Sequence, residues 1–286
     1  MHEHVIVDFI GAAELVPGRY DAEEAFAAAL PHLRELRRAG CRTLVEPTPE
    51  HIGRDAALLQ RLSRASGLQI VCATGIYGAA NQKFIPAFAR EETAEQLAAR
   101  YQAEFRDGIG TTGIRPGLIK TGVNRAPLPE IERKLIRAAA LAHKATGLPV
   151  ASHTGPGAAA LEQLGIFASA GAPAGAFVWV HAQNEKDHAL HLQVARAGAW
   201  VEFDGIREAS LDWHVECVRA MKQAGLLHRT LISQDAGWYH VGEPKGGKYR
   251  GYTLLFREFL PRLAFNKAEV NQLLVGNPRA AFSPTA

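Results

Sequence analysis

Apolar residues along the chain form short runs that alternate with longer amphipathic stretches. The runs are rich in Val, Ile, Leu and Thr, and they lie at residues 41–48, 68–77, 115–122, 149–155, 177–183, 200–205 and 230–237, with the opening MHEHVIVDF as an eighth. Polar and apolar residues do not alternate cleanly within them, which is typical of parallel strands covered on both faces. The pattern therefore predicts eight buried parallel strands.

Helical patterns occupy the intervals between these runs. They cover residues 21–40, 54–67, 92–108, 128–147, 158–171, 184–198 and 210–225, and several end in Gly, the usual stop signal of a helix. A strand followed by a helix, repeated along the chain without a linker rich in Pro, Gly or Ser, predicts an α/β fold. We expect a single (β/α)8 TIM barrel over residues 1–286, with its active site at the C-terminal ends of the strands. A doubly wound open sheet is the competing fold, but no GxGxxG or Walker A loop follows a strand.

Composition and charge exclude several classes of protein. The 286 residues are 47% apolar and 21% charged, which is ordinary for a globular protein with a large core. The net charge is only +3, and no basic run is interleaved with aromatic residues, so we expect no nucleic-acid partner. No apolar run reaches the roughly 18 residues of a membrane span, and no signal-like leader precedes the first strand, so a cytoplasmic protein is expected. Cys41, Cys72 and Cys217 are too few for a disulfide framework and are predicted to be reduced and mostly buried.

Two histidines stand at the start of the chain, in MHEH. Because a strand places residues i and i+2 on the same face, His2 and His4 would point one way and Glu3 the other. An isolated HxH pair at a terminus is otherwise a solvated tail without function. The remaining candidate ligands decide between these two interpretations.

Four further reactive side chains close apolar runs. Lys120 closes GLIK, His153 closes VASH, His181 closes FVWVH and Asp235 closes LISQD. Since the strand ends of a barrel form one rim, these side chains are expected to meet the opening histidines there. Imidazole and carboxylate are ligands of zinc and similar metals, and four His with one Asp exceed what one ion usually takes. Two metals are therefore predicted, and Lys120 beside them must be neutral or modified.

The ordered motifs resemble the phosphotriesterase-like family of the amidohydrolase superfamily. The resemblance covers nearly the whole chain: HEH, residues 52–77, IKTG, SHTG, VHAQ, EFDG, SQDA, and the closing FLPRL and VGNPRAAF. It implies that Lys120 is carboxylated by CO₂ and bridges two divalent ions, with zinc expected first and cobalt, manganese or iron as alternatives. It also implies that His2, His4 and Asp235 hold the more buried ion, that His153 and His181 hold the more exposed one, and that the protein forms a homodimer.

A binuclear site predicts hydrolysis of an ester-like bond. Two close divalent ions turn a bridging water into hydroxide at neutral pH, and Asp235 is suited to accept its proton and pass it to the leaving group. We expect a small-molecule lactone as substrate, with phosphotriesters and other phosphate or carboxyl esters as the alternative. A protein of a different class, a barrel that kept the fold but has a degraded metal site and no turnover, is the competing hypothesis.

The sequence gives weaker signals for the substrate-binding residues than for the metal ligands. Tyr77 matches a tyrosine that lies beside the metals in lactonase-like members of the family, and it either polarises the substrate or packs at the barrel mouth. Residues 237–252 carry Lys245, Lys248 and Arg250, and this loop is either a cationic lid for a hydroxylated or anionic substrate or a solvated loop.

Other polar residues near the predicted strand ends are Glu46, Asp204 and Arg207. Asp204 is expected to orient a ligand or cap a loop, and Glu46 either orients a ligand or acts directly. The remaining histidines are predicted to be mostly at the surface and none is assigned to a metal: His32, His51, His143, His188, His191, His214, His228 and His240.

The opening segment begins only one residue before its first ligand. Strand residues that precede HEH in the family have no counterpart here, so backbone groups that would pair with neighbouring strands are expected to be missing. The first strand is therefore predicted to be truncated and frayed, with His2 and His4 poorly held.

Overall fold

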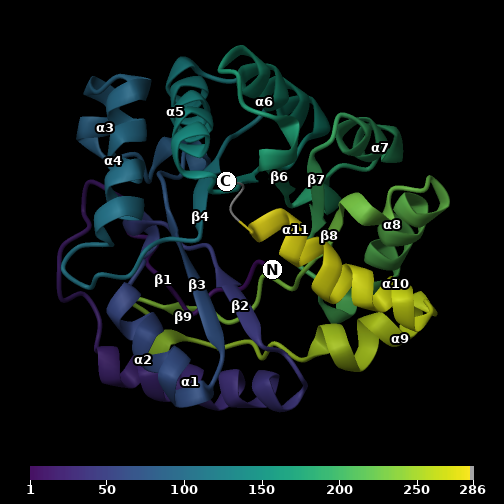
Figure 1. The fold of residues 1–286 in the computed structure, drawn as a ribbon. Coiled ribbons are helices and arrows are strands. Elements are labelled where there is room, and N and C mark those ends of the chain that lie inside the picture. The colour runs from purple at the N-terminus through teal and green to yellow at the C-terminus, as the bar shows by residue number, and fades with distance from the viewer. Residues whose placement is uncertain (284–286) are drawn as a thin grey trace.

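A computed structural model describes residues 1–283, and its centre is a parallel sheet that curls round on itself (Figure 1). Its strands pair in chain order: β2 (Thr43–Glu46), β3 (Gln69–Thr74), β4 (Leu118–Gly122), β5 (Val150–His153), β6 (Phe177–Val180), β7 (Trp200–Phe203) and β8 (Thr230–Ile232). All neighbouring pairs are parallel. The α/β class and the places of these seven strands agree with the prediction, and a strand order without reversal argues against a doubly wound sheet.

The opening segment lies between the two edges of this sheet. On one side, the Glu3 N–H donates to the carbonyl oxygen of Val45 in β2 at 3.1 Å. On the other side, the His4 N–H donates to the carbonyl oxygen of Ala236, just after β8, at 2.8 Å. The opening segment therefore joins the first and last strands of the sheet through its backbone.

An eighth regular strand is present only in part. The strand at the opening, β1 (Ile6–Val7), is two residues long and pairs in parallel with β9 (Tyr239–His240) rather than with the seven-stranded sheet. The expectation of a frayed start is nevertheless wrong, because His2 is only 2% exposed and His4 8%. Hydrogen bonds on both sides replace the pairing that a longer strand would make.

Helices surround the sheet on its outer side (Figure 1). They are α1 (Ala22–Arg38), α2 (Ala56–Ser66), α3 (Ala87–Glu91), α4 (Ala94–Asp107), α5 (Glu130–Thr146), α6 (Gly157–Ser169), α7 (His188–Arg196), α8 (Leu211–Gln223), α9 (Leu260–Leu263), α10 (Lys267–Asn271) and α11 (Asn277–Phe282), with π-helical turns at Leu255–Phe259 and Gln272–Gly276. Local signals set their ends: Asp55 caps the start of α2 by accepting the Leu58 N–H, and Gly67 ends it with φ 73°. Every predicted helix is found, whereas α3 and the helices after residue 253 were not among the predicted patterns.

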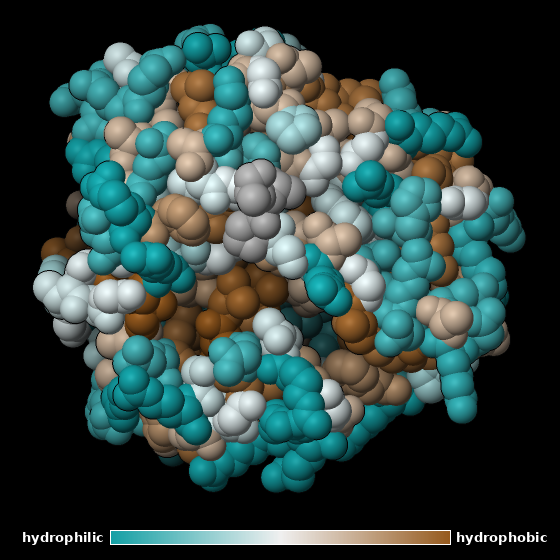
Figure 2. Space-filling model, in the orientation of Figure 1, coloured by the Kyte–Doolittle hydropathy of each residue, from teal (hydrophilic) through white to brown (hydrophobic). Residues whose placement is uncertain are grey.

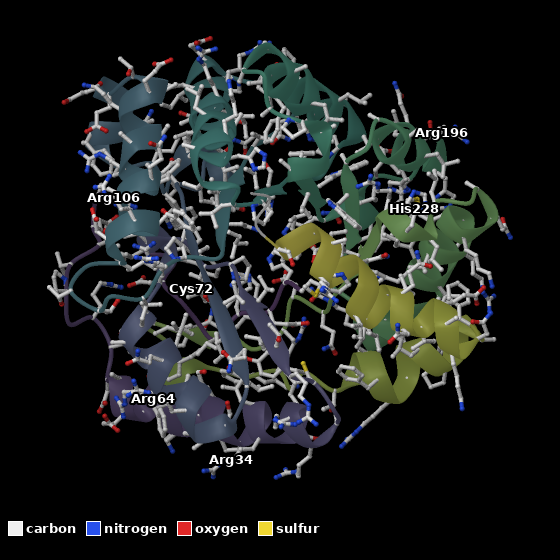
Figure 3. All side chains as sticks on the ribbon, in the orientation of Figure 1. Arg34, Arg64, Cys72, Arg106, Arg196 and His228 are labelled. Carbon is white, nitrogen blue, oxygen red and sulfur yellow. The ribbon has the colours of Figure 1, made fainter. Side chains whose placement is uncertain are left out.

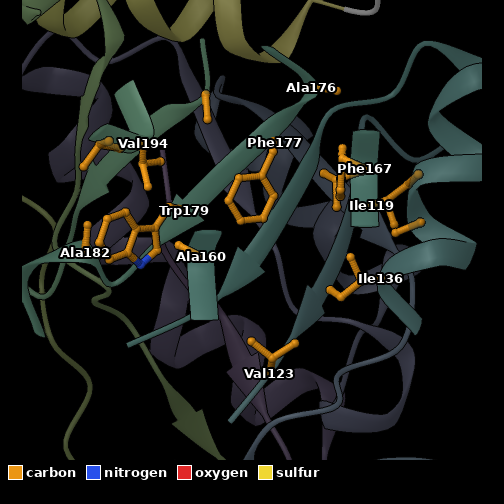
Figure 4. Close-up of a cluster of buried hydrophobic side chains, with 14 of the residues drawn as sticks. Ile119, Val123, Ile136, Ala160, Phe167, Ala176, Phe177, Trp179, Ala182 and Val194 are labelled. Carbon is orange, nitrogen blue, oxygen red and sulfur yellow. The ribbon is translucent and has the colours of Figure 1, made fainter. Parts of the chain in front are cut away.

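Both faces of the strands are buried, as the lack of alternation predicted. In β6, neighbouring Val178 and Trp179 are each completely buried. Trp179 packs in the outer layer between sheet and helices, where Phe167 of α6 and Phe177 meet with ring centres 5.4 Å apart (Figure 4). Burying each such aromatic side chain stabilises the fold by about 1.5–3 kcal/mol.

A second apolar layer fills the inside of the curled sheet. Every strand of the sheet gives at least one buried side chain to it: Val45, Ala73, Leu118, Ala151, Val178, Val180, Trp200 and Leu231. Ala281 of α11 packs against this layer, and Figure 1 shows α11 crossing the middle of the view. One end of the sheet's interior is therefore filled and covered, which leaves the other end for a pocket.

The outer surface is mostly polar. Figure 2 shows hydrophilic residues over the outer helices and hydrophobic ones gathered toward the middle of this face, and Figure 3 shows Arg34, Arg106 and Arg196 at the periphery with Cys72 inside. All three cysteines are free, two of them buried, as predicted. Within residues 1–283, no helix is both long and apolar enough to cross a bilayer.

Candidate metal centre

Three of the predicted ligands converge at the C-terminal ends of the strands. The Nε2 atoms of His2 and His4 are 3.1 Å apart, and Asp235 Oδ1 lies 3.9 Å from the first and 3.3 Å from the second. Donor atoms around a tetrahedral ion, with bonds of about 2.0–2.2 Å, sit roughly 3.4 Å apart. The three atoms therefore have the spacing of a metal-binding triad.

Asp235 presents its oxygen from an uncommon backbone conformation, with φ 50°. Its Oδ1 is buried and accepts no hydrogen bond from any of the described residues 1–283. Burial raises the pKa of Asp235, but His4 and His181 together hold that pKa below its usual range. A buried carboxylate oxygen with no donor, beside two imidazole nitrogens, fits a bound cation.

His4 is oriented by a short relay of hydrogen bonds. Its Nδ1 pairs with Thr48 Oγ1 at 2.6 Å, and the Thr48 hydroxyl donates to Glu46 Oε1 at 2.5 Å. Burial lowers the pKa of His4, but Asp235 and Glu46 raise it to about 9, so these surroundings favour a positive charge here. The relay directs Nε2 toward the triad, in the way that outer hydrogen bonds orient metal-bound histidines. Of the two roles left open for Glu46, the structure supports the orienting one.

Asp204 orients His181. The His181 Nδ1 pairs with Asp204 Oδ1 at 2.5 Å, and its backbone N–H donates to Oδ2 at 2.9 Å. Gln183 Nε2 adds a third hydrogen bond at 2.9 Å. Burial by itself raises the pKa of Asp204, but the interactions with His181 and Gln183 together lower that pKa below its usual value. His2, His181 and Asp204 also lie close enough to share an ion, yet the bonds that Asp204 already makes leave it as the orienting group that the sequence predicted.

The pair predicted for the more exposed ion also lies together. His153, at the end of β5, faces His181 with ring centres 4.2 Å apart and planes at 77°. Tyr77, just after β3, lies beside His153 at 5.1 Å. Burial lowers the pKa of His153 well below its usual value and raises that of Tyr77. A neutral imidazole is the metal-binding form of histidine, so His153 is suited to a ligand role.

Lys120 is buried in β4 beneath these side chains, with 2% of its surface exposed. Burial lowers its pKa to about 8, although Asp204 and Glu202 act in the opposite direction. The backbone at Gly75 (φ 111°), just after the neighbouring strand β3, passes very close to Lys120. A Cβ atom at this position would lie 2.2 Å from the Lys120 carbonyl oxygen. Only glycine fits there, so Gly75 is required for the approach of the strand ends.

The loop that carries Asp235 is held on its N–H side by Glu3. The Glu3 carboxylate accepts the Ser233 hydroxyl at 2.8 Å, the Gln234 N–H at 2.9 Å and the Ala236 N–H at 2.8 Å. Burial raises the pKa of Glu3. The middle residue of HEH thus fixes the third ligand of the triad, a role that the sequence did not predict.

The carbonyl side of the same loop is held by a cation. Arg250 donates to the carbonyl oxygens of Gln234 at 2.6 Å and Asp235 at 3.0 Å, and Trp238 Nε1 donates to the Asp235 carbonyl at 2.7 Å. An anion at the N–H groups and a cation at the carbonyl groups keep the strained Asp235 backbone in place.

A pocket of about 740 Å³ opens above the converging ligands. One wall is apolar and comes from the loops after β8, β1, β2 and β3, with Val7, Phe9, Ile52, Tyr77, Phe84 and Trp238. The opposite wall is polar and comes from the loops after β6 and β7, with Gln183, Asn184, Lys186, Arg207, Ser210 and His214. The size is that of a small-molecule site.

The loop at residues 237–252 contributes less to the pocket than a lid would. Trp238 lines the pocket, whereas Lys245 and Lys248 do not, and Arg250 points to the backbone of the Asp235 loop. The interpretation as a cationic lid is therefore wrong for these three residues.

Several histidines predicted at the surface are buried. His191 is bonded to the Ala182 carbonyl, His143 to the Leu148 carbonyl, and His214 to the carbonyls of Ser210 and Asp204. Their helical spacing gave no signal for burial, because the acceptors lie in neighbouring loops. None of them joins the metal-binding groups found among residues 1–283.

Comparison with known proteins gives one consistent result. The model of the phosphotriesterase family matches residues 1–282. The phosphotriesterase homology protein of Escherichia coli (strain K12) is 29% identical over 288 residues, which cover 98% of this chain and 96% of the relative. Its crystal structure, a complex with phosphate in the active site, matches with a TM-score of 0.86 and 28% identity, covering 99% of this chain and 97% of that one.

Other relatives differ in what they are named for. The aryldialkylphosphatase of Saccharolobus solfataricus is 24% identical over 99% of this chain and 94% of its own length. Another solved structure belongs to work that engineered organophosphate hydrolysis activity from a weak promiscuous lactonase template. It matches with a TM-score of 0.86 and 29% identity, covering 99% of this chain and 94% of that one.

Proposed function

Because the chain belongs to the phosphotriesterase family, we propose that it is a metal-dependent hydrolase of an ester-like bond, with a lactone as the first candidate substrate. One observation carries the proposal: the Nε2 atoms of His2 and His4 and the buried Oδ1 of Asp235 have the spacing of ligands to one ion, and Oδ1 accepts no hydrogen bond from residues 1–283. Buried polar atoms left in such an arrangement are costly unless a cation binds them.

The proposal includes two divalent ions. His2, His4 and Asp235 would hold the deeper one, and His153 and His181 the one nearer the pocket. When bound, such ions supply a water of lowered pKa and a Lewis acid for the oxygen of the ester. Zinc is the first candidate, with cobalt, manganese or iron as alternatives.

Lys120 is proposed to join the two sites as a carboxylated lysine. CO₂ adds to a neutral amine, and burial lowers the pKa of Lys120 to about 8, so a substantial part of it is neutral near physiological pH. The carbamate would form with release of a proton to water, and it would be an anion whose two oxygens are potential metal ligands. A carbamate anion at this position would offset the positive charge of the two ions, whereas a lysine ammonium would add to that charge.

Asp235 and Tyr77 are the proposed catalytic side chains. Asp235 lines the pocket, so its carboxylate is placed to accept a proton and pass it to the leaving group. Tyr77 lines the same pocket beside His153, and its phenol, whose pKa is raised by burial, stays a hydrogen-bond donor to a substrate oxygen.

The same proposal includes a closed barrel built as one domain. The opening segment bonds to β2 on one side and to Ala236, in the loop after β8, on the other, which is the place of the eighth strand. We further propose a homodimer, which light scattering of the purified protein tests.

Phosphate esters are the second candidate substrates. A relative of 24% identity is named an aryldialkylphosphatase, and the lactonase template of 29% identity was engineered toward organophosphates. Parallel assays on aliphatic lactones, aryl carboxyl esters and dialkyl aryl phosphates rank the candidates by kcat/KM. A lactone preference supports the first candidate, and a preference for the phosphates replaces it by the second.

Metal analysis tests the whole proposal against a barrel without turnover. Protein expressed with zinc, cobalt or manganese should carry close to two ions per chain by mass spectrometry, and removing them should abolish hydrolysis. A chain that binds no metal and hydrolyses no ester would be the non-catalytic alternative.

A further inference from the structure

The charged residues of the pocket are distributed unevenly. Apart from the metal-centre residues, the charged side chains that line it are Lys83, Lys186 and Arg207, all exposed, and no carboxylate accompanies them. Lys186 and Arg207 come from the neighbouring loops after β6 and β7, on the polar wall. Lys83 lies on the opposite, apolar side, next to Phe84.

These cations have no anionic partner in the part of the chain that the structure describes. Among residues 1–283, no carboxylate oxygen lies within ion-pair distance of Lys83, Lys186 or Arg207, whereas many other arginines are paired, such as Arg54 with Glu104. Unpaired cations that surround a pocket raise the local concentration of anions there.

The carboxylate that precedes Lys186 in the sequence already accepts backbone hydrogen bonds. Glu185 accepts the backbone N–H groups of Gly157 at 3.0 Å, Lys186 at 2.7 Å and Asp187 at 3.0 Å. Its negative charge is therefore directed to the loop backbone and leaves the Lys186 ammonium unneutralised.

Both cations of the polar wall are supported by their surroundings. The Lys186 ammonium donates to the Gln183 carbonyl at 3.2 Å and lies 4.2 Å from the ring centre of Trp213, whose Nε1 bonds the same carbonyl at 2.8 Å. Arg207 Nε approaches the Gly205 carbonyl at 3.4 Å, and its backbone N–H donates to Ser210 Oγ at 3.2 Å. Because these contacts already restrict the two side chains, ligand binding costs less side-chain conformational entropy.

We infer that the substrate carries a carboxylate or phosphate group, which Arg207 and Lys186 bind at the polar wall, and an apolar part that lies against Phe9, Phe84 and Trp238. This inference rests on the proposed function, because it takes the bond to be cleaved to lie between the walls, over the metal centre. The guanidinium of Arg207 binds planar or tetrahedral oxyanions through two parallel hydrogen bonds, and Lys186 adds a point charge.

Ligand binding to the metal-loaded protein tests the inference without turnover. Calorimetry compares dicarboxylates from succinate to adipate with monocarboxylates of the same chain length, so that one carboxylate can reach the metal centre in every case. Phosphonopropionate replaces the distal carboxylate by a phosphonate and distinguishes the two oxyanions.

The variants are Arg207→Gln and Lys186→Met, and the controls are Arg125→Gln and Lys248→Met, exposed cations that do not line the pocket. Metal content is measured for each.

At least one of the two-anion ligands should bind roughly tenfold tighter than its monocarboxylate, and each pocket variant should remove most of that advantage while the controls keep it. Equal binding of dianions and monoanions, no binding of either, or equal losses in pocket and control variants would overturn the anion site. The proposed function fails separately, by the absence of bound metal and of any ester hydrolysis in the substrate panel.

Discussion

The Glu3 carboxylate accepts the backbone N–H of Ala236 at 2.8 Å, across 233 positions of sequence. Together with its bond to the Gln234 N–H, this contact encloses Asp235 from both sides. The residue between the two opening histidines therefore links the first two ligands of the proposed site to the third.

Replacement of Glu3 by Gln should reduce turnover while the protein stays folded. The amide keeps the shape but loses the negative charge that serves three donors, so the Asp235 loop is held less firmly. We expect kcat to fall roughly tenfold with little change in KM, and the deeper ion to exchange faster. Glu14→Gln, at an exposed position of the opening loop, is the control. An unchanged kcat together with unchanged metal exchange would remove Glu3 from the positioning of Asp235.

Replacement of Lys120 by Met should remove metal and activity together. The variant keeps the buried aliphatic stem but cannot form the carbamate, so the charge compensation for both ions is lost. Metal content is expected to drop from near two ions per chain to well below one. In Lys120→Ala, short carboxylates added to the buffer should restore part of the activity. If Lys120→Met keeps both ions and full turnover, Lys120 has only a structural role.

Asp235→Asn should depress kcat more than KM. Asparagine can still ligate through its oxygen but cannot accept the proton, so a loss of roughly a hundredfold or more is expected. His153→Asn provides the contrast, because it should weaken retention of the more exposed ion first. Metal titration with a chelator, read alongside steady-state kinetics, separates the two effects. An Asp235→Asn enzyme with normal turnover would exclude this residue from proton transfer.

Buried His191 should make the protein less stable in mild acid. Burial lowers its pKa to about 4, whereas the same side chain in the unfolded chain titrates near 6.5. Between these values the unfolded chain binds the extra proton, so the free energy of unfolding falls as the pH drops from about 6.5 to about 4, by on the order of 3 kcal/mol.

Urea unfolding of the wild type and of His191→Gln across this pH range measures that dependence. The variant should be less stable at neutral pH, because a buried hydrogen bond to the Ala182 carbonyl is altered, and its stability should depend less on pH. His228→Gln, at an exposed site, serves as the control. Parallel curves for the wild type and His191→Gln would show that His191 does not cause the acid sensitivity.

Much of the fold follows from local features of the sequence. Continuous apolar runs with Gly-terminated helices between them predicted the parallel strands and their order, because burial on both faces and helix capping act over a few residues. The candidate ligands were found in the same way: His153, His181 and Asp235 end or closely follow a strand, Lys120 lies two residues before the end of β4, and parallel strands bring such ends to one rim.

The parts that the sequence left undecided depend on contacts between distant segments. The opening segment was expected to fray, yet it bonds to Val45 and Ala236, and no local pattern could show that both partners would be within reach. Apart from the metal-centre residues, the cations that line the pocket are Lys83, Lys186 and Arg207 rather than those of residues 237–252, because the direction of a loop is set by its packing and not by its composition. The sequence by itself thus determined the strands and the chemical types of the ligands, since periodicity and residue identity are local. Only the tertiary structure decided that Glu3 and Arg250 hold the loop of Asp235 in place, since the fold alone brings these distant residues together.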